Sequence, residues 1–408
     1  MVNLYSSTPQ QRVVVTGIGT VSSIGIGKEP FWKNLLSGTS GISVVESLDT
    51  SSYNRHYAGE IKNFDPTQFM SKRRAKRIGR ASQMAIAAGQ LAIQDSGFDL
   101  KRFPRENTGL FIGTTMGENI FVEQFHDAQQ AEREFEKYKF RVFSSDYISA
   151  NTAAFLKLNG PNKIFATACA SGNYAIGRAY DYISTGRSDV CLAGGSDALS
   201  RIAYTGFHRL FAMAPEQCQP FDVNRKGMIL GEGCCLLILE ALEHAQARKA
   251  NIIAEVLGYG LSCDAYHMTQ PKQSGIAKAI NKAINRSKVD RQRIGYVCAH
   301  GTGTPENDKA ESGAIHDVFG EQVKDLAVSS IKSMLGHTMG AASAFEAATC
   351  CLAVKEEEIP PTINFTEKDP ECDIDCVPNS SRKVKLDVAL NNASAFGGNN
   401  CCVAFGAV

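Results

Sequence analysis

Residues 163–185 read KIFATACASGNYAIGRAYDYIST, and this stretch decides the class of fold. The run Lys163–Thr167 predicts a short strand, and Gly172–Thr185 has apolar residues at helical spacing until Gly186 ends the pattern. Between them, small residues surround Cys169 and favour a sharp turn from strand to helix. A strand that leads directly into a helix is the repeating unit of an α/β protein.

Strand and helix signals alternate along the whole chain, which predicts parallel strands joined by crossover helices. The second half repeats the first in outline. Four strand-like segments have counterparts: Val13–Gly19 with Ala254–Gly260, Thr108–Gly113 with Ile294–Ala299, Val190–Gly195 with Val388–Asn391, and Cys234–Leu239 with Cys401–Phe405. We therefore expect an internal duplication with a seam near residue 255, and two fused halves at residues 1–255 and 256–408.

The composition of the 408 residues predicts a large globular protein. Hydrophobic residues make up 43% and charged residues 21%, so a sizeable core can form and wholesale disorder is excluded. The net charge of +1 gives no overall attraction to nucleic acid or an anionic membrane. Because no apolar run approaches the ~20 residues of a membrane span and the amino terminus lacks a signal pattern, we expect a cytoplasmic protein.

Cysteines and glycines each offer a misleading motif. Most of the 13 cysteines stand in apolar runs, so we expect buried free thiols; Cys372 and Cys376 lack the further ligands of a zinc site. Gly17-Ile-Gly19 suggests a dinucleotide site, but Ser22 replaces the third glycine of that motif. We expect a tight turn there instead.

Cys169 is the strongest candidate for a nucleophile because it lies at a strand end and at the mouth of a helix. Helix-terminal amides stabilise a thiolate by ~0.3–2 kcal/mol, which predicts that the pKa of Cys169 lies about one unit below its ordinary value. A buried structural cysteine beside a helix start is the alternative, and spacing alone leaves it open.

Two histidines favour the nucleophile. His300 and His337 each follow an apolar strand and stand among glycines, where a ring nitrogen can reach a ligand. They occupy matching positions opposite a cysteine of the other half, so we expect one shared active site. Metal binding is the alternative. The histidines are not at a local ligand spacing and no carboxylate pairs with them as in H-E-x-x-H, so we expect no metal.

Six motifs resemble β-ketoacyl-acyl-carrier-protein synthases of the Cys-His-His type, in the order found there. They are TACASG, PFDVNRKGMILGEG, DAYHMT, AHGTGTPENDKAE, SSIKSMLGHTMGA and AFGGNN. The resemblance extends from Val13 to Phe405 and implies a thiolase-like fold, an α/β fold of five layers (αβαβα) built from two duplicated halves. It also implies an acyltransferase that joins an acyl-S-enzyme to malonyl-acyl-carrier-protein by decarboxylative Claisen condensation.

The resemblance implies a role for each residue that matches the family's motifs. Cys169 would hold the acyl group, His300 and His337 would stabilise the enolate, and Lys332 and Glu311 would orient them. The N–H groups of Cys169 and Phe396 would form an oxyanion hole, and Phe396 would also act as a gate. Three threonines would bind the pantetheine arm: Thr269, Thr302 and Thr304. Met116 and Phe207 would line the acyl pocket. No cofactor is implied, because the acyl carrier protein brings the phosphopantetheine.

A finer resemblance points to the catalytic ketosynthase (α) subunit of type II polyketide synthases. Residues 77–83, 329–337 and 369–375 carry it. The chain departs from the fatty-acid enzymes at Glu118, Asn119 and Asn399, and from both the fatty-acid and the polyketide enzymes at Ala170. These departures concern the acyl substrate. A housekeeping synthase II is the alternative. A non-catalytic chain-length-factor-like subunit or a degradative thiolase fits less well, because the former typically lacks the nucleophile and the latter needs a second reactive cysteine.

The resemblance also implies partners. Acyl carrier protein is the expected substrate carrier, and a dimer is expected, either a homodimer or a heterodimer with a chain-length-factor homologue. The basic run at residues 70–80 contains Arg73, Lys76 and Arg77, which match docking positions of the family. A solvated helix face is the alternative for that run.

Overall fold

The computed structural model describes residues 10–99, 103–136, 139 and 143–408. Strands of the first half lie in the order β1-β9-β7-β5-β6. Their bounds are Val13–Ser22 (β1), Gly233–Ala241 (β9), Val190–Asp197 (β7), Gly109–Gly113 (β5) and Asn162–Phe165 (β6). β9 runs antiparallel to β1 and β7, whereas β5 runs parallel to β7 and β6.

The second half repeats this topology strand for strand. Its strands lie in the order β10-β16-β15-β11-β12. Their bounds are Ala254–Cys263 (β10), Asn399–Gly406 (β16), Val388–Ser394 (β15), Ile294–Cys298 (β11) and Ala327–Ser329 (β12). β16 runs antiparallel to β10 and β15, and β11 runs parallel to β15 and β12. All four predicted strand correspondences are therefore confirmed.

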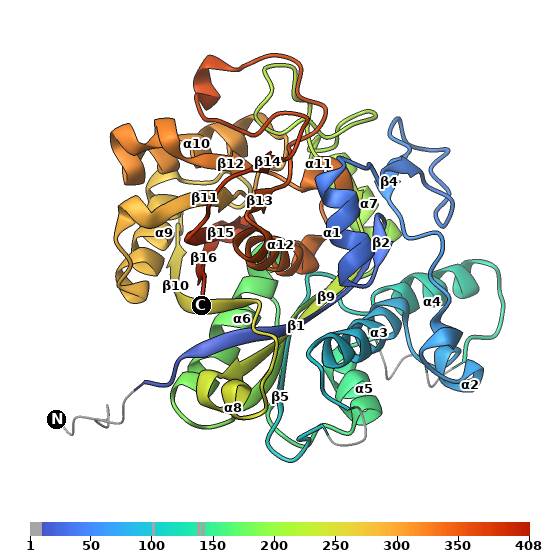
Figure 1. Ribbon diagram of the computed structural model, residues 1–408. Helices are drawn as coiled ribbons and strands as arrows, with labels where there is room; N and C mark the ends of the chain where they lie inside the picture. The colour runs from blue at the N-terminus through green and yellow to red at the C-terminus, as the bar shows by residue number, and fades with distance from the viewer. Residues whose placement is uncertain (1–9, 100–102, 137–138, 140–142) are drawn as a thin grey trace.

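The two five-stranded arrays join where β1 pairs with β10, and helices cover both faces of each array (Figure 1). Helices α6 (Ser171–Ser184) and α12 (Ala342–Glu356) pack between the arrays. Helices α3 (Arg80–Asp95) and α5 (Asp146–Leu156) cover the first array, and α9 (Gln273–Ser287) and α10 (Pro305–Phe319) cover the second. The five layers expected from the resemblance are thus present.

The remaining elements connect these layers or lie at their margins. The helices are α1 (Lys28–Leu36), α2 (Lys72–Ala75), α4 (Ile120–Gln130), α7 (Arg201–Arg209), α8 (Leu242–Ala247) and α11 (Lys332–Leu335). The short strands are β2 (Gly25–Ile26), β3 (Ser43–Val44), β4 (Tyr57–Gly59), β8 (Leu230–Gly231), β13 (Glu358–Ile359) and β14 (Arg382–Lys383). None of the helices described is long and apolar enough to cross a membrane.

The run Cys234–Leu239 shows why the strands are apolar on both faces. Leu236 and Ile238 pack under the outer helix α3, while Cys235 and Leu237 pack against the central helices. Successive side chains of a strand point to opposite faces, so a sheet covered on both sides needs an unbroken apolar run. Twelve of the cysteines are buried as expected, and Cys263 is exposed.

Gly19 lies within β1, so the tight turn expected at Gly17-Ile-Gly19 is wrong. A Cβ atom at Gly19 would lie 1.9 Å from the Ala88 carbonyl oxygen of α3. Gly260 of β10 has the same place against α9, where a Cβ would lie 2.2 Å from the Ala279 oxygen. Both glycines therefore let an outer helix approach its sheet closely, and the duplication repeats the device.

Candidate active site

Cys169 lies in a single turn of 3-10 helix, Ala168–Ala170 (η3), that follows β6 and leads into α6. The Ser171 hydroxyl donates to the Ala168 carbonyl at 2.6 Å and accepts the Thr167 N–H at 2.9 Å. Ala168 has a φ of 49°, a conformation that is uncommon for non-glycine residues. The small residues around Cys169 thus form the predicted sharp turn, and the thiol side chain is 6% exposed.

Burial raises the pKa of the Cys169 thiol to about 12, although the nearby Lys332 ammonium acts in the opposite direction. The lowered thiol pKa predicted from the sequence is therefore wrong. The free energy lost when a thiolate is removed from water exceeds the stabilisation that the amides at the start of α6 provide. The sequence pattern indicated the helix terminus and gave no measure of the burial.

His300 follows β11, and Glu311 of α10 holds its main chain. The Glu311 carboxylate accepts the N–H groups of His300 at 2.7 Å and Gly301 at 2.8 Å, and the Asn392 amide at 2.6 Å. Glu311 therefore positions the loop of His300 and makes no hydrogen bond to its imidazole. Its own pKa is raised, because full burial outweighs these three hydrogen bonds.

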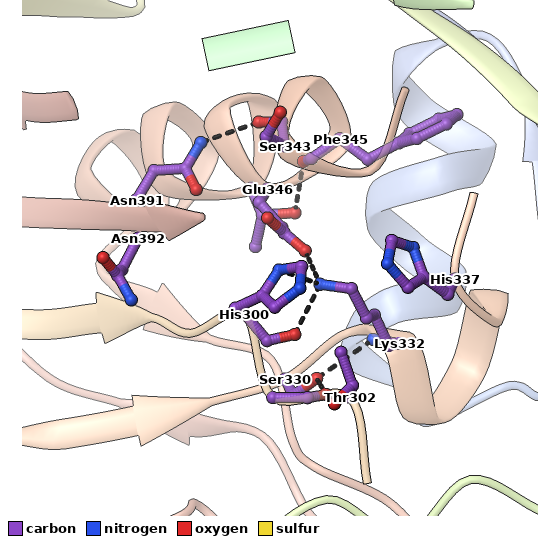
Figure 2. Close-up of polar contacts among 12 residues, drawn as sticks. His300, Thr302, Ser330, Lys332, His337, Ser343, Phe345, Glu346, Asn391 and Asn392 are labelled. Atoms are coloured by element: carbon purple, nitrogen blue, oxygen red, sulfur yellow. Dashed lines mark hydrogen bonds and ion pairs between the residues drawn. The ribbon is translucent and has the colours of Figure 1, made fainter. Parts of the chain in front are cut away.

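Lys332 contacts the His300 ring directly (Figure 2). Its Nζ lies 3.3 Å from Nδ1 of His300 and donates to the His300 carbonyl at 2.5 Å. It also forms an ion pair with Glu346 of α12, and both side chains are almost completely buried. The ammonium offers only donors, so Nδ1 of His300 accepts and its Nε2 carries the proton.

Glu346 lies outside the six sequence motifs. Its signal is present, because Glu346 is the single charged residue in the apolar run 338–354 that forms most of α12. An isolated carboxylate in a helix buried on all sides requires a partner. Burial raises the pKa of Glu346 to about 7, and Lys332 opposes that shift.

His337 lies in the turn between α11 and α12. Its Nδ1 accepts the N–H of Met339 at 3.1 Å, so its Nε2 carries the proton as well. Burial, together with the Lys332 charge, lowers the pKa values of His337 and His300 well below the ordinary histidine value. Both rings are therefore neutral at pH 7, and each presents one N–H donor.

The nucleophile and the two rings meet in one place. A sulfur atom of Cys169 and one nitrogen of each histidine lie within 4.8 Å of one another, and the two ring centroids are 5.3 Å apart. Zinc uses such a donor set. The Lys332 ammonium adjoins this cluster, and its positive charge opposes a cation there. The arrangement suits an anion that forms between the two rings.

A cavity of about 350 Å³ opens onto these three residues. Its wall includes five of the residues predicted to bind substrate: Phe207, Thr269, Thr302, Thr304 and Phe396. The Thr302 and Thr304 hydroxyls lie 2.8 Å apart, and the Phe207 and Phe396 rings are 5.7 Å apart. Met116 does not line this cavity but packs in the same apolar cluster as Phe207.

Apolar side chains that the sequence analysis missed surround the mouth of the cavity. Leu210, Phe211 and Met268 line it and are 51%, 92% and 73% exposed. Phe211 has a φ of 56°, which directs the chain sharply after α7. Single exposed apolar residues give no signal in the sequence.

The predicted docking residues lie around α2. Arg73, Lys76 and Arg77 are exposed. Arg80, in the same basic run, is bound instead by Glu232 through two hydrogen bonds of 2.7 and 2.8 Å. The basic run therefore divides into an exposed group and a structural arginine.

Known proteins resemble this chain in both sequence and fold. Residues 10–245 match the β-ketoacyl synthase N-terminal domain, and residues 253–366 match the β-ketoacyl synthase C-terminal domain. The chain is 37% identical over 407 residues to 3-oxoacyl-[acyl-carrier-protein] synthase 2 of Synechocystis sp., covering 97% of this chain and 98% of that one. The chain therefore belongs to the β-ketoacyl synthase family.

Solved structures agree with this assignment. The ishigamide ketosynthase/chain length factor superposes with a TM-score of 0.95 at 40% identity, over 98% of this chain and 100% of that one. A type II PKS ketosynthase in complex with its acyl-carrier protein superposes with a TM-score of 0.90 at 30% identity, with the same coverage. The protein is thus a carbon–carbon bond-forming acyltransferase, a β-ketoacyl-acyl-carrier-protein synthase.

Proposed function

We propose that the chain performs its condensation at the Cys169–His300–His337 cluster, as the catalytic ketosynthase subunit of a type II polyketide or polyene synthase. The Cys169 sulfur attacks the thioester carbonyl of an acyl carrier protein, the carrier thiol leaves with the proton, and the acyl group stays on Cys169. The Cys169 and Phe396 N–H groups stabilise the tetrahedral oxyanion.

The second half-reaction uses the two histidines. Malonyl carrier protein loses carbon dioxide, and the electrons of the broken bond form a thioester enolate. The Nε2–H groups of His300 and His337 donate to the enolate oxygen, which explains why both rings must be neutral and carry the proton on the same nitrogen. The enolate carbon then attacks the acyl carbonyl, and the Cys169 thiolate leaves.

The other predicted residues have supporting roles. Lys332 and Glu311 position His300, the first through the ring and the second through the main chain. The pantetheine arm lies along Thr302 and Thr304, which line the cavity with Thr269. Phe396 separates the acyl and malonyl subsites. Its loop is anchored by the next residue, Gly397, whose N–H donates to the Met268 carbonyl at 2.7 Å. The enzyme needs no cofactor of its own in this scheme.

One observation favours the polyketide role over a housekeeping synthase II. Glu118 follows Met116 and Gly117, and its side chain is 1% exposed. It accepts the Ser82 N–H at the start of α3 at 2.8 Å, and burial raises its pKa to about 7. Met116, two residues before Glu118, packs in the apolar cluster of Phe207. If the acyl chain lies along Met116, the Glu118 carboxyl group would place a polar group close to the methylenes of a long saturated chain.

Competition between substrates tests this proposal. The chain receives equal amounts of saturated and α,β-unsaturated octanoyl-length carrier thioesters with malonyl carrier protein, and mass spectrometry quantifies both products. We expect the unsaturated substrate to be preferred, with the preference reduced in Glu118→Ala. A preference for the saturated chain, unchanged in Glu118→Ala, would identify a fatty-acid enzyme.

Two variants test the division of labour. Cys169→Ala should form no acyl adduct yet still release carbon dioxide from malonyl carrier protein, because both histidines remain. His337→Ala should lose ~10²–10³ in decarboxylation, the cost of one oxyanion donor, and less in acylation. An acyl adduct on the Cys169→Ala protein, or a His337→Ala defect restored by zinc, would contradict the assignment.

A further inference from the structure

Asp197 ends β7 and is completely buried beside the active site. Its carboxylate accepts four hydrogen bonds, from the Thr114 hydroxyl at 2.6 Å and from the N–H groups of Thr115, Met116 and Gly340 at 2.8, 2.9 and 2.7 Å. Neither the condensation chemistry above nor any of the sequence motifs uses this residue. Its donors come from two segments far apart in the chain, residues 114–116 and residue 340.

The bond to Gly340 connects Asp197 with His337. Gly340 is in the single turn Met339–Ala341 (η6), and Met339, the residue before it, has a φ of 53°. That turn directs the Met339 N–H toward Nδ1 of His337. Holding the Gly340 N–H therefore holds the peptide groups whose hydrogen bond selects the His337 tautomer.

The bonds to residues 114–116 reach the acyl side of the site. Met116 shares an apolar cluster with Phe207, which lines the substrate cavity. The Thr114 carbonyl accepts the Ser171 hydroxyl at 3.3 Å beside the nucleophile turn. One carboxylate thus joins residues 114–116 to the turn that follows His337.

We propose that Asp197 is a positioning residue that fixes His337 with its Nε2–H directed into the cavity. Asp197 also holds this donor at a constant position relative to the acyl subsite. This inference rests on the proposed roles of His337 and Cys169. Asp197 touches no reacting atom. It acts by fixing a main-chain turn, as a second carboxylate, Glu311, does for the His300 loop.

The experiment separates the two half-reactions in Asp197→Asn. The amide keeps the shape but turns one acceptor oxygen into a donor facing N–H groups. Because a misplacement of ~1 Å can cost ~10²-fold in rate, we expect carbon dioxide release to fall by about that factor. Acylation of Cys169, measured by intact mass, should fall less than about threefold, because Ser171 holds the nucleophile turn through Ala168 and Thr167.

The matched control is Asp222→Asn. Asp222 is also completely buried and also accepts one hydroxyl and three N–H groups, from Thr366, Asn224 and Glu367, and these bonds involve no segment of His337. It should leave the ratio of the two half-reactions unchanged. Thr114→Val removes only the acyl-side hydroxyl and should also spare decarboxylation. An equal loss of both half-reactions in Asp197→Asn, or the same split in Asp222→Asn, would overturn the inference.

Nitrogen-15 spectra of the His337 ring give a readout that does not depend on activity. The wild-type ring should show an unprotonated Nδ1, and Asp197→Asn should shift or broaden that signal while Asp222→Asn should not. An unaltered His337 signal in Asp197→Asn would contradict the proposal even if the enzyme's overall function were misassigned. If Asp197→Asn does not fold, Asp197→Ser, which keeps one acceptor oxygen, replaces it with the same expected split.

Discussion

At the scale of single residues, burial makes the thiol of Cys169 a poor acid. Because burial raises its pKa to about 12, only a very small fraction of Cys169 is thiolate at pH 8. Because the folded-state pKa is raised, the reactive form increases tenfold with each pH unit below about 12. Iodoacetamide labelling of Cys169, followed by peptide mass spectrometry, should therefore be slow at pH 7 and rise steeply to pH 9.

Cys263, the exposed cysteine, provides the internal reference in the same digest. It should label readily at pH 8, when Cys169 labels slowly. Fast labelling of Cys169 at pH 7 would show instead that the start of α6 outweighs the burial of the thiol.

The Lys332–Glu346 pair is the second prediction at this scale. Glu346→Gln leaves the buried Lys332 ammonium without its counter-charge, which costs ~3–5 kcal/mol of unfolding free energy. The double variant Lys332→Met with Glu346→Leu should recover most of that stability in urea denaturation, because neither charge is then buried. It should remain inactive in decarboxylation, since Nδ1 of His300 has lost its donor.

A fully active double variant would show that the pair is structural only. A double variant as unstable as Glu346→Gln would show that packing, and not the unpaired charge, causes the loss.

At the scale of elements, the exposed charges around α2 should govern the encounter with the carrier protein. Reversal of Arg73, Lys76 and Arg77 to Glu should lower kcat/KM for carrier-bound substrate about tenfold at low salt, and less at ~0.15 M salt, where the Debye length is ~8 Å. Turnover of a small pantetheine thioester should be unaffected, because such a substrate needs only the cavity.

Three exposed lysines elsewhere serve as the control reversal: Lys33, Lys278 and Lys288. These should leave both substrates unaffected. Equal loss with both substrates in the α2 variant would indicate a folding defect, and no loss with either would make the basic run a solvated face.

At the scale of the whole molecule, the two margins of the sheet differ. The β12 margin is covered, since the Val328 N–H donates to Asp375 of a following loop at 2.8 Å. No described strand covers the far side of β6. The Pro161 and Phe165 carbonyls accept the N–H groups of Leu110 and Thr114 on the β5 side. Because successive residues of a strand direct their peptide groups to opposite sides, the N–H of Ile164 points away from the sheet. Such an open edge is a template for pairing with another chain.

We therefore expect that the dimer implied by the family resemblance, if the chain forms it, uses β6. Ile164→Pro removes an outward N–H and should convert the dimer to monomers in sedimentation, whereas Ile164→Ala loses the side chain and should remain dimeric. A dimer that survives Ile164→Pro would place the interface elsewhere. Co-expression with a homologue that lacks the nucleophile distinguishes a heterodimer from a homodimer.

The sequence by itself determined the architecture. Unbroken apolar strands such as Cys234–Leu239 and the matched pairs of segments predicted covered sheets and a duplication, because side-chain period and residue order are local properties. The motifs around Cys169, His300 and His337 likewise predicted which residues meet. Residue type and spacing are sufficient to predict these features without the tertiary structure.

Only the tertiary structure decided the electrostatics and the close packing. The pKa of Cys169 depends on its burial and on charges such as Lys332 of the other half. Glu346 meets Lys332 only when the second half folds, and Asp197 meets Gly340 only when both halves fold together. The sequence predicted a turn at Gly19, whereas the structure places Gly19 in β1, where α3 packs against it. The physical reason is common to all of them: desolvation, ion pairing and close approach depend on which surfaces meet in space, and local sequence spacing does not encode that.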